Sequence, residues 1–365
     1  MAKRLVVCCD GTWNRPDQLK HGVPTATNVS KLALGVARED AKGIRQLLFY
    51  QHGVGTQRFE RIRGGALGFG LSRNVRDCYR FLVENYEPGD ELYLFGFSRG
   101  AFTARSTAGL VRNAGILRPE HLARIDDAYR LYRAREDTRR PRGVEARIFR
   151  RMYSHPENDI KFVGVWDTVG SLGIPTGVLR LPFLTRRWSF HDTTLSSRVR
   201  FAYHALAIDE LRKPFKPTLW EQKERVPGQT LEQVWFAGVH SDVGGGYPEP
   251  DLADIALLWM MQRARGTGLA FDPDHLKPST PPIDAELRAL GAQVAPDALG
   301  PIHQSRKGIY LLQPPHLRPP KADGGAAASS AVRRLRDKAD YVAPNLDQWV
   351  AADGPITDVP EGGLR

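Results

Sequence analysis

The sequence predicts a three-layer α/β/α sandwich around a mostly parallel central sheet. Short apolar runs alternate with amphipathic segments through the first two thirds of the chain, an alternation typical of strand–helix–strand units. The runs are apolar on both faces, as the strands of a buried parallel sheet are. Hydrophobic residues make up 41% of the chain and charged residues 25%. A large core can therefore form, and a wholly disordered chain is excluded.

The expected elements follow from these two periods. Apolar, β-branched runs predict strands at residues 4–9, 46–51, 92–97, 161–166 and 233–239. Amphipathic periodicity predicts helices at residues 28–37, 72–86, 101–114, 120–135, 195–209 and 251–265. The carboxyl ends of the parallel strands then form one edge of the sheet, and sheets of this kind place their ligands there.

The chain divides into one large domain over residues 1–270 and an extension over residues 271–365 that wraps the same domain. The extension contains PSTPP, QPPHLRPP and DGGAAASSA, and such proline-rich and small-residue stretches make regular sheet unexpected there. Residues 173–190, GIPTGVLRLPFLTRRWSF, have no clean period. We expect a lid at the substrate entrance, with Phe183 and Trp188 as substrate contacts; a buried excursion under the tail is the alternative.

The N-terminus and the cysteines indicate the compartment. The apolar stretch before Asp10 is too short for a signal peptide, and no stretch approaches the roughly 18 apolar residues of a membrane-spanning helix. We expect a cytoplasmic product as synthesised, with export by a dedicated secretion system as an open alternative. Cys8, Cys9 and Cys78 fit neither a disulfide framework nor a zinc site, and are expected to be reduced core residues.

The formal net charge of +11 predicts a surface that attracts anions. The positive charge is densest between residues 118 and 151, where arginines fall on expected helices. A solvated basic face is one interpretation, and peripheral contact with an anionic membrane is the other. No nucleic-acid recognition motif stands out, so nucleic acid is not an expected partner. The oligomeric state stays open.

A candidate nucleophile lies at the end of the third expected strand. Residues 91–101 read ELYLFGFSRGA, in which Gly96, Ser98 and Gly100 form a G-x-S-x-G pattern between a strand and a helix. That context is required for a nucleophile elbow, in which a tight turn exposes the serine hydroxyl above the carboxyl edge of the sheet. A glycine-rich turn that merely packs a helix closely against a strand is the alternative.

A base and an acid are expected at two further strand ends. The strand FVGVW ends in Asp167, and the strand VWFAGV ends in His240. The chain order Ser98, Asp167, His240 is that of α/β-hydrolases. We therefore predict Ser98 as nucleophile, His240 as general base and Asp167 as the acid that orients it. Asp242 is the rival acid, although its place beside His240 suits it to bracing the glycine turn.

Main-chain N–H groups beside the nucleophile are the expected oxyanion hole. The N–H of Arg99 lies at the start of the helix after Ser98, and the loop after the first strand could supply a second donor from Gly11 or Thr12. The D-G-T run that begins at Asp10 also suggests a haloacid-dehalogenase phosphatase. In that interpretation the nucleophilic aspartate would fall at position 8, which is Cys8.

Five spaced motifs carry a resemblance to a known family: CCDGTWN, GFSRGAFTAR, GVWDTVGSLG, HALAIDELRKPFKPTLW and WFAGVHSDVGGGY. Over residues 4–265 the chain resembles a bacterial family of α/β-hydrolase-like domains that includes the catalytic domain of type VI secretion phospholipase effectors. The resemblance implies hydrolysis of acyl esters, with the family's triad on Ser98, Asp167 and His240. It supports a phospholipid substrate less strongly than it supports ester chemistry.

The expected activity is that of a serine ester hydrolase, lipase-like or phospholipase A-like, acting through an acyl-enzyme. A soluble carboxylesterase and a non-catalytic module that binds anionic lipid are the alternatives. We expect no cofactor and no metal in the chemistry, because nucleophile, base and oxyanion donors are all protein groups. The SDVGGGY turn carries oxygens that could hold a structural cation instead.

Overall fold

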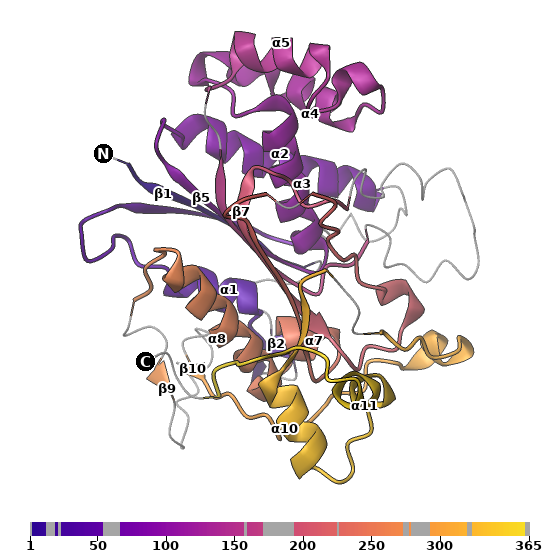
Figure 1. Ribbon diagram of the computed structural model, residues 1–365. Helices are drawn as coiled ribbons and strands as arrows, with labels where there is room; N and C mark the ends of the chain where they lie inside the picture. The colour runs from indigo at the N-terminus through magenta and orange to yellow at the C-terminus, as the bar shows by residue number, and fades with distance from the viewer. Residues whose placement is uncertain are drawn as a thin grey trace.

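A parallel sheet forms the middle of the protein in the computed structural model, which describes residues 2–11, 19–20, 23–53, 66–156, 159–170, 193–224, 226–272, 277–278, 293–319 and 323–361. The described strands of this sheet number eight, in the order β12-β11-β8-β7-β6-β5-β1-β4, and every neighbouring pair is parallel (Figure 1). Their bounds are β1 Arg4–Cys9, β4 Gln46–Gln51, β5 Glu91–Phe97, β6 Ile160–Trp166, β7 Val199–Ala207, β8 Thr230–Phe236, β11 Gly325–Ala328 and β12 Ile356–Thr357.

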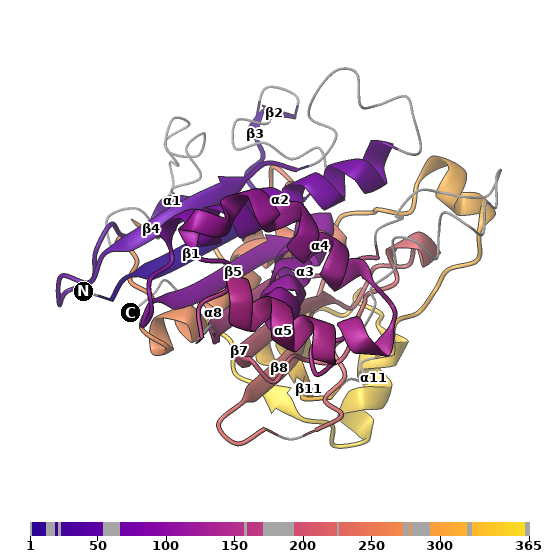
Figure 2. The same cartoon turned by 90° about the horizontal axis from the view of Figure 1, so that it is seen from above.

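Helices cover both faces of the sheet, which confirms the predicted sandwich (Figures 1 and 2). One layer contains α2 Ala66–Asn85, α3 Arg99–Ala114, α4 Ile125–Arg133 and α5 Val144–Tyr153. The other contains α1 Asn28–Gly35, α7 His240–Gly244, α8 Asp251–Gly266, α10 Ser329–Asp337 and α11 Pro344–Ala351. None of the helices in the described ranges is both long and apolar enough to span a membrane.

Shorter elements connect these layers. An antiparallel pair joins β2 Leu19–Lys20 to β3 Val23–Pro24, and a parallel pair joins β9 Lys277–Pro278 to β10 Gln293–Val294. Single 3₁₀ turns are η1 Pro119–Arg124, η2 Asp137–Arg139, η3 Lys213–Phe215 and η4 Gly308–Leu312. Two of them, η3 and η4, contact each other through the rings of Phe215 and Tyr310, and Phe215 also contacts the ring of His240 at the carboxyl edge of the sheet.

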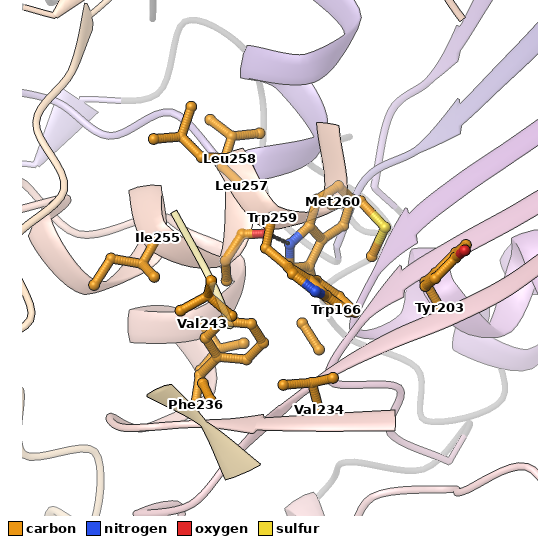
Figure 3. Packing of buried hydrophobic residues seen from close by; sticks show 14 of the residues in the cluster. Trp166, Tyr203, Val234, Phe236, Val243, Ile255, Leu257, Leu258, Trp259 and Met260 are labelled. Carbon is orange, nitrogen blue, oxygen red and sulfur yellow. Dashed lines mark hydrogen bonds between the residues drawn. The ribbon is translucent and has the colours of Figure 1, made fainter. Parts of the chain in front are cut away.

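Alternate strand residues supply two separate cores. On β1, Leu5 and Val7 belong to the core under α2 and α3, whereas Val6 and Cys8 belong to the core under α1 and α8. In the second core the rings of Trp166 and Phe236 project from the sheet toward Trp259 of α8 (Figure 3). Both faces of the sheet are therefore buried, as its continuous apolar strands require.

The three cysteines lie inside these cores. Cys8, Cys9 and Cys78 are buried and reduced, as the sequence predicted, and the sulfurs of Cys9 and Cys78 lie 3.5 Å apart. This contact joins the end of β1 to α2.

The predicted helix at residues 195–209 is wrong, because this segment contains the central strand β7. Residues 202–207 are buried on both faces, so the segment has the continuous apolar character that periodicity cannot distinguish from a buried helix. His204, which we placed on a helix, lies instead in this strand.

The expectation of no regular sheet beyond residue 272 is also wrong. The run GAAA at Gly325–Ala328 pairs with β8, and Ile356–Thr357 adds the last strand. Ala327 and Ala328 are fully buried. Their small side chains allow α10 to pack closely over the strand, which is why so alanine-rich a segment can join a sheet. The extension also reaches the carboxyl edge of the sheet, where Arg318 contacts Asp167.

Candidate active site

Ser98 lies in the sharp turn between β5 and α3. Its φ of 57° and ψ of −118° are unusual for a residue with a side chain, and this strained geometry is typical of a nucleophile elbow. A Cβ on Gly96 would lie 2.5 Å from the carbonyl oxygen of Gly100, and a Cβ on Gly100 would collide with the carbonyl oxygen of Cys9. Both glycines are therefore required, because the main chain of the elbow packs against itself and against β1.

His240 is the first residue of α7 and contacts Ser98. Its Nε2 lies 2.8 Å from the Oγ of Ser98, and its Nδ1 lies 2.5 Å from the Oδ2 of Asp167. The ring of Phe97 lies 4.6 Å from the imidazole and the ring of Phe215 lies 5.0 Å from it, between centroids. Hydrogen bonds at both nitrogens and two aromatic rings therefore fix the orientation of the imidazole.

Asp167, directly after β6, is completely buried and ionised. Burial by itself would raise its pKa, but the charge of Arg318 and the hydrogen bond from His240 hold the pKa of this carboxyl well below its usual range. An ionised carboxylate can only accept, so the Nδ1 of His240 carries the proton. The lone pair of Nε2 then faces the hydroxyl of Ser98, which is the tautomer that a general base needs.

Arg318 also binds the carboxylate of Asp167. Its Nη1 donates to Oδ1 at 2.7 Å and its Nη2 to Oδ2 at 3.1 Å, so the pairing is bidentate. The guanidinium also donates to the carbonyl oxygens of Ala207 and Phe215, and the Nδ2 of Asn345 donates to the carbonyl oxygen of Arg318 at 2.8 Å. The side chain is 1% exposed. The proline-rich extension therefore supplies the positive charge that keeps the buried acid ionised.

Glu210 is a second buried carboxylate beside His240. Its Oε2 accepts the main-chain N–H of His240 at 3.3 Å and the hydroxyl of Ser305 at 3.0 Å. Arg212 pairs with it at 2.7 Å, and the guanidinium carbon of Arg212 lies 3.6 Å from the centroid of the Phe215 ring. Burial alone would raise the pKa of Glu210, but the hydrogen bonds from Arg212 lower it. Glu210 thus fixes the start of α7, the helix that begins with the predicted base His240.

Asp242, the rival acid, faces away from His240. Its Oδ2 accepts the main-chain N–H of Val239 at 2.9 Å and caps α7, while its Oδ1 lies 2.6 Å from the Nδ1 of His303. His303 also bonds Glu249 at 3.1 Å through Nε2, and the hydrogen bond to Asp242 is the main cause of its raised pKa. No group of three or more acidic, histidine or cysteine side chains suited to a metal ion occurs in the described ranges.

The predicted oxyanion donors lie in different surroundings. Arg99 is the first residue of α3, where an N-terminal N–H has no partner within the helix. The N–H of Gly11 donates to the Oδ1 of its neighbour Asp10 at 2.6 Å. Asp10 also accepts from Thr27 and Tyr50, so it braces the loop. Thr12 lies outside the described residues, as do the whole segment 173–190 and its predicted substrate contacts Phe183 and Trp188.

Sequence reasoning missed the residues that support the proposed triad. Arg318 stands alone between prolines, and Glu210 and Arg212 lie in a motif with no local catalytic pattern. His204 accepts the N–H of Thr168 at 3.1 Å, and burial lowers its pKa to about 3, so it stays neutral and positions the chain beside Asp167. The signal in the sequence was the density of charged residues in DELRK, which follows the apolar run of β7.

A parallel sheet that carries Ser98, His240 and Asp167 in a hydrogen-bonded series at its carboxyl edge places the chain in the class of α/β-hydrolase-like proteins. The sequence profile of the type VI secretion system Tle1-like phospholipase effectors, catalytic domain, matches residues 3–263. The chain belongs to this family. Membership supports a phospholipase-type or lipase-type hydrolase.

Individual relatives are more distant. An uncharacterized protein of Saccharomyces cerevisiae is 28% identical over an alignment of 246 residues, and the match covers 62% of this chain and 34% of that protein. The crystal structure of an uncharacterized protein from Pseudomonas aeruginosa matches 80% of this chain and 48% of its own, with 18% identity and a TM-score of 0.44. The structure of the Tle1 effector bound to the VgrG spike of the type VI secretion system matches over 68% of this chain and 52% of that chain, with 18% identity and a TM-score of 0.38. The chain spans 34% to 52% of the length of these proteins.

Proposed function

We propose that the chain hydrolyses acyl esters of phospholipids through an acyl-enzyme on Ser98. The hydrogen-bonded series from Ser98 through His240 to Asp167 is the observation that carries the proposal. The family description as phospholipase effectors supports phospholipid as the substrate class. The net charge of +11 agrees with contact at an anionic membrane surface.

The proposed reaction has two halves. In the first, the Oγ of Ser98 attacks the ester carbonyl carbon while its proton passes to the Nε2 of His240. The tetrahedral intermediate collapses, the carbon–oxygen bond to the alcohol breaks, and Nε2 returns the proton to the departing oxygen. In the second, a water attacks the acyl-enzyme, gives its proton to Nε2, and the fatty acid leaves as Ser98 regains a proton. Asp167 stays ionised throughout and stabilises the imidazolium.

The oxyanion of each intermediate is proposed to lie at the N-terminus of α3. The N–H of Arg99 is the first donor, and the partial positive charge of a 16-residue helix adds to it. Gly11 and Thr12 are the proposed sources of a second donor. Because the Gly11 N–H bonds Asp10, it would have to exchange that partner for the substrate.

The substrate class is tested with p-nitrophenyl esters of increasing chain length and with phospholipid vesicles, measuring nitrophenol and free fatty acid. A phospholipase should release fatty acid from vesicles and prefer long acyl chains. A chain that hydrolyses only short soluble esters would instead be a carboxylesterase. Absence of turnover on every ester, with a folded protein, would contradict the enzymatic proposal altogether.

The choice of acid is tested by a matched pair of substitutions. Asp167→Asn should lower kcat by about 10⁴-fold, because an amide cannot hold the imidazole in the required tautomer. Asp242→Asn should keep kcat within about tenfold, since the amide oxygen of asparagine can still accept the main-chain N–H of Val239 and the side chain contacts His303. Melting temperatures of both variants control for folding. Near wild-type turnover in Asp167→Asn beside an inactive Asp242→Asn would reassign the acid.

A further inference from the structure

A cavity of about 520 Å³ lies on the opposite edge of the sheet from Ser98. Its wall is built from the end of α3, from α5 and from the segments that precede β6 and β7. The arginines that line it are Arg112, Arg118, Arg142, Arg150, Arg151 and Arg198. The other lining residues among those that the structure describes are prolines, serines and His155.

The strand directions separate this cavity from the proposed active site. Ser154 and His155 precede β6, and Ser197 and Arg198 precede β7, so they lie at the amino ends of these strands. The triad residues follow the carboxyl ends of β5, β6 and β8. Because all these strands are parallel, the two sites lie at opposite edges of the sheet, and α5 and α7 lie far apart in Figure 1.

The cavity carries an excess of positive charge. Among the described residues, Arg118 pairs with Glu120 at 2.9 Å, Arg142 with Glu224 at 3.1 Å and Arg198 with Asp159 at 2.9 Å. The three carboxylates are 61%, 67% and 75% exposed, so these pairs are weak and open to competition from an anionic ligand.

The lowered pKa of Arg150 reflects the same excess of positive charge. Burial lowers its pKa first, and the positive charges of Arg198 and Arg147 lower it further. A guanidinium whose protonation is disfavoured by its neighbours lies in a region of net positive potential. A bound anion would relieve that repulsion.

Backbone carbonyls hold part of the wall in place. Arg118 donates to the carbonyl oxygens of Ser154 at 3.0 Å and Met152 at 2.6 Å. Arg150 donates to those of Asn113 at 2.6 Å and Pro141 at 2.8 Å. Fixed guanidiniums lose little entropy on binding, and their fork geometry matches the oxygens of phosphate. The exposed Arg142, Arg151 and Arg198 can close on a ligand from the rim.

We propose that this cavity binds a compact anion that carries several phosphate groups, either free in solution or as the headgroup of a lipid. The volume is within the range of small-molecule sites, which is about 300–1,000 Å³. Even with the exposed partners Glu120, Glu224 and Asp159 in place, the arginines of the wall carry more charge than a single carboxylate or monophosphate can neutralise. The site is independent of the proposed ester chemistry, and its role would be to anchor or regulate the chain rather than to react.

The first experiment titrates inorganic tripolyphosphate into the full chain by calorimetry at about 0.15 M salt, where interactions beyond about 8 Å are largely screened. Arg151→Gln/Arg198→Gln should weaken binding at least tenfold, because it removes two exposed guanidiniums from the rim. The control, Arg73→Gln/Arg80→Gln, removes two exposed arginines from α2, one of them also paired with a carboxylate. It should change the affinity less than twofold.

The second experiment identifies the source of the phosphates. Vesicles with a phosphatidylinositol bisphosphate and vesicles with an equal fraction of phosphatidylglycerol are sedimented with the same variants, each also carrying Ser98→Ala to prevent turnover. Loss of binding to the phosphatidylinositol bisphosphate vesicles in the cavity variant, but not in the control variant, identifies a lipid headgroup; loss of tripolyphosphate binding without loss of vesicle binding identifies a free anion. The proposal is overturned when neither probe distinguishes the cavity variant from its control, or when neither binds the unsubstituted cavity.

Discussion

Ser98→Ala should lower turnover of every ester substrate by at least about 10⁴-fold, because the substitution removes the only atom that forms the acyl-enzyme in the proposed reaction. The fold should survive. The side chain is small, and its unusual backbone geometry is imposed by the packing of Gly96 and Gly100 against their neighbours. Circular dichroism and the melting temperature check the fold, and single-turnover kinetics measure the loss.

A fluorophosphonate probe provides an independent readout, since it reacts with an activated serine whether or not the natural substrate is known. The unsubstituted chain should be labelled and Ser98→Ala should not. Ser106→Ala, which alters a buried serine further along α3, serves as the matched control and should be labelled normally. Labelling that persists in Ser98→Ala would place the nucleophile elsewhere.

Arg318→Gln should destabilise the protein by about 3–5 kcal/mol and abolish most activity, because it leaves Asp167 buried without its cation. The depressed pKa of Asp167 contributes stability above the pKa of the unfolded chain and loses it as pH falls through the folded pKa. The difference in the free energy of unfolding between wild type and variant should therefore be largest at neutral pH and smaller in acid. Thermal unfolding across pH measures it.

The pH profile of the residual activity shows whether Arg318 sets the ionisation of Asp167 or only packs against it. Without Arg318 the pKa of Asp167 rises, so the variant should regain activity as pH increases over a range in which wild type is already constant. Arg318→Lys keeps the charge but loses the bidentate pairing, so its activity should lie between those of wild type and Arg318→Gln. Arg334→Gln removes another buried arginine of the extension, one bonded to the carbonyls of Ala298 and Gly300. Arg334→Gln should lower the free energy of unfolding and leave the pH profile of activity unchanged. If Arg318→Gln and Arg334→Gln have the same pH profile, the role given to Arg318 is contradicted.

The sequence predicted the elements whose physical cause is local. The strands at 4–9 and 46–51 have the predicted bounds, because each is a bounded apolar run. The positions of Ser98, Asp167 and His240 could be inferred together, because each follows a strand whose carboxyl end must lie at one edge. Their hydrogen bonds follow that placement.

What the sequence did not predict depends on tertiary context. β7 is apolar on both faces because it is central, and nothing in its residues distinguishes it from a buried helix. β11 has little strand propensity of its own, so its conformation comes from pairing with β8. Arg318 lies 151 residues from the carboxylate that it neutralises. A single arginine among prolines offers no periodicity or motif from which such a contact could be inferred.

Arg318 is synthesised after Ser98, Asp167 and His240, and this order has a consequence for the cell that makes the protein. A nascent chain interrupted between residues 240 and 318 already holds Ser98, Asp167 and His240, yet lacks the guanidinium that keeps the buried carboxylate ionised. Docking of that guanidinium also involves Asn345, which bonds its main chain. On the proposed mechanism, hydrolytic competence arises only after the tail has emerged and folded back. Prematurely terminated chains would then be chemically harmless to the membranes around them.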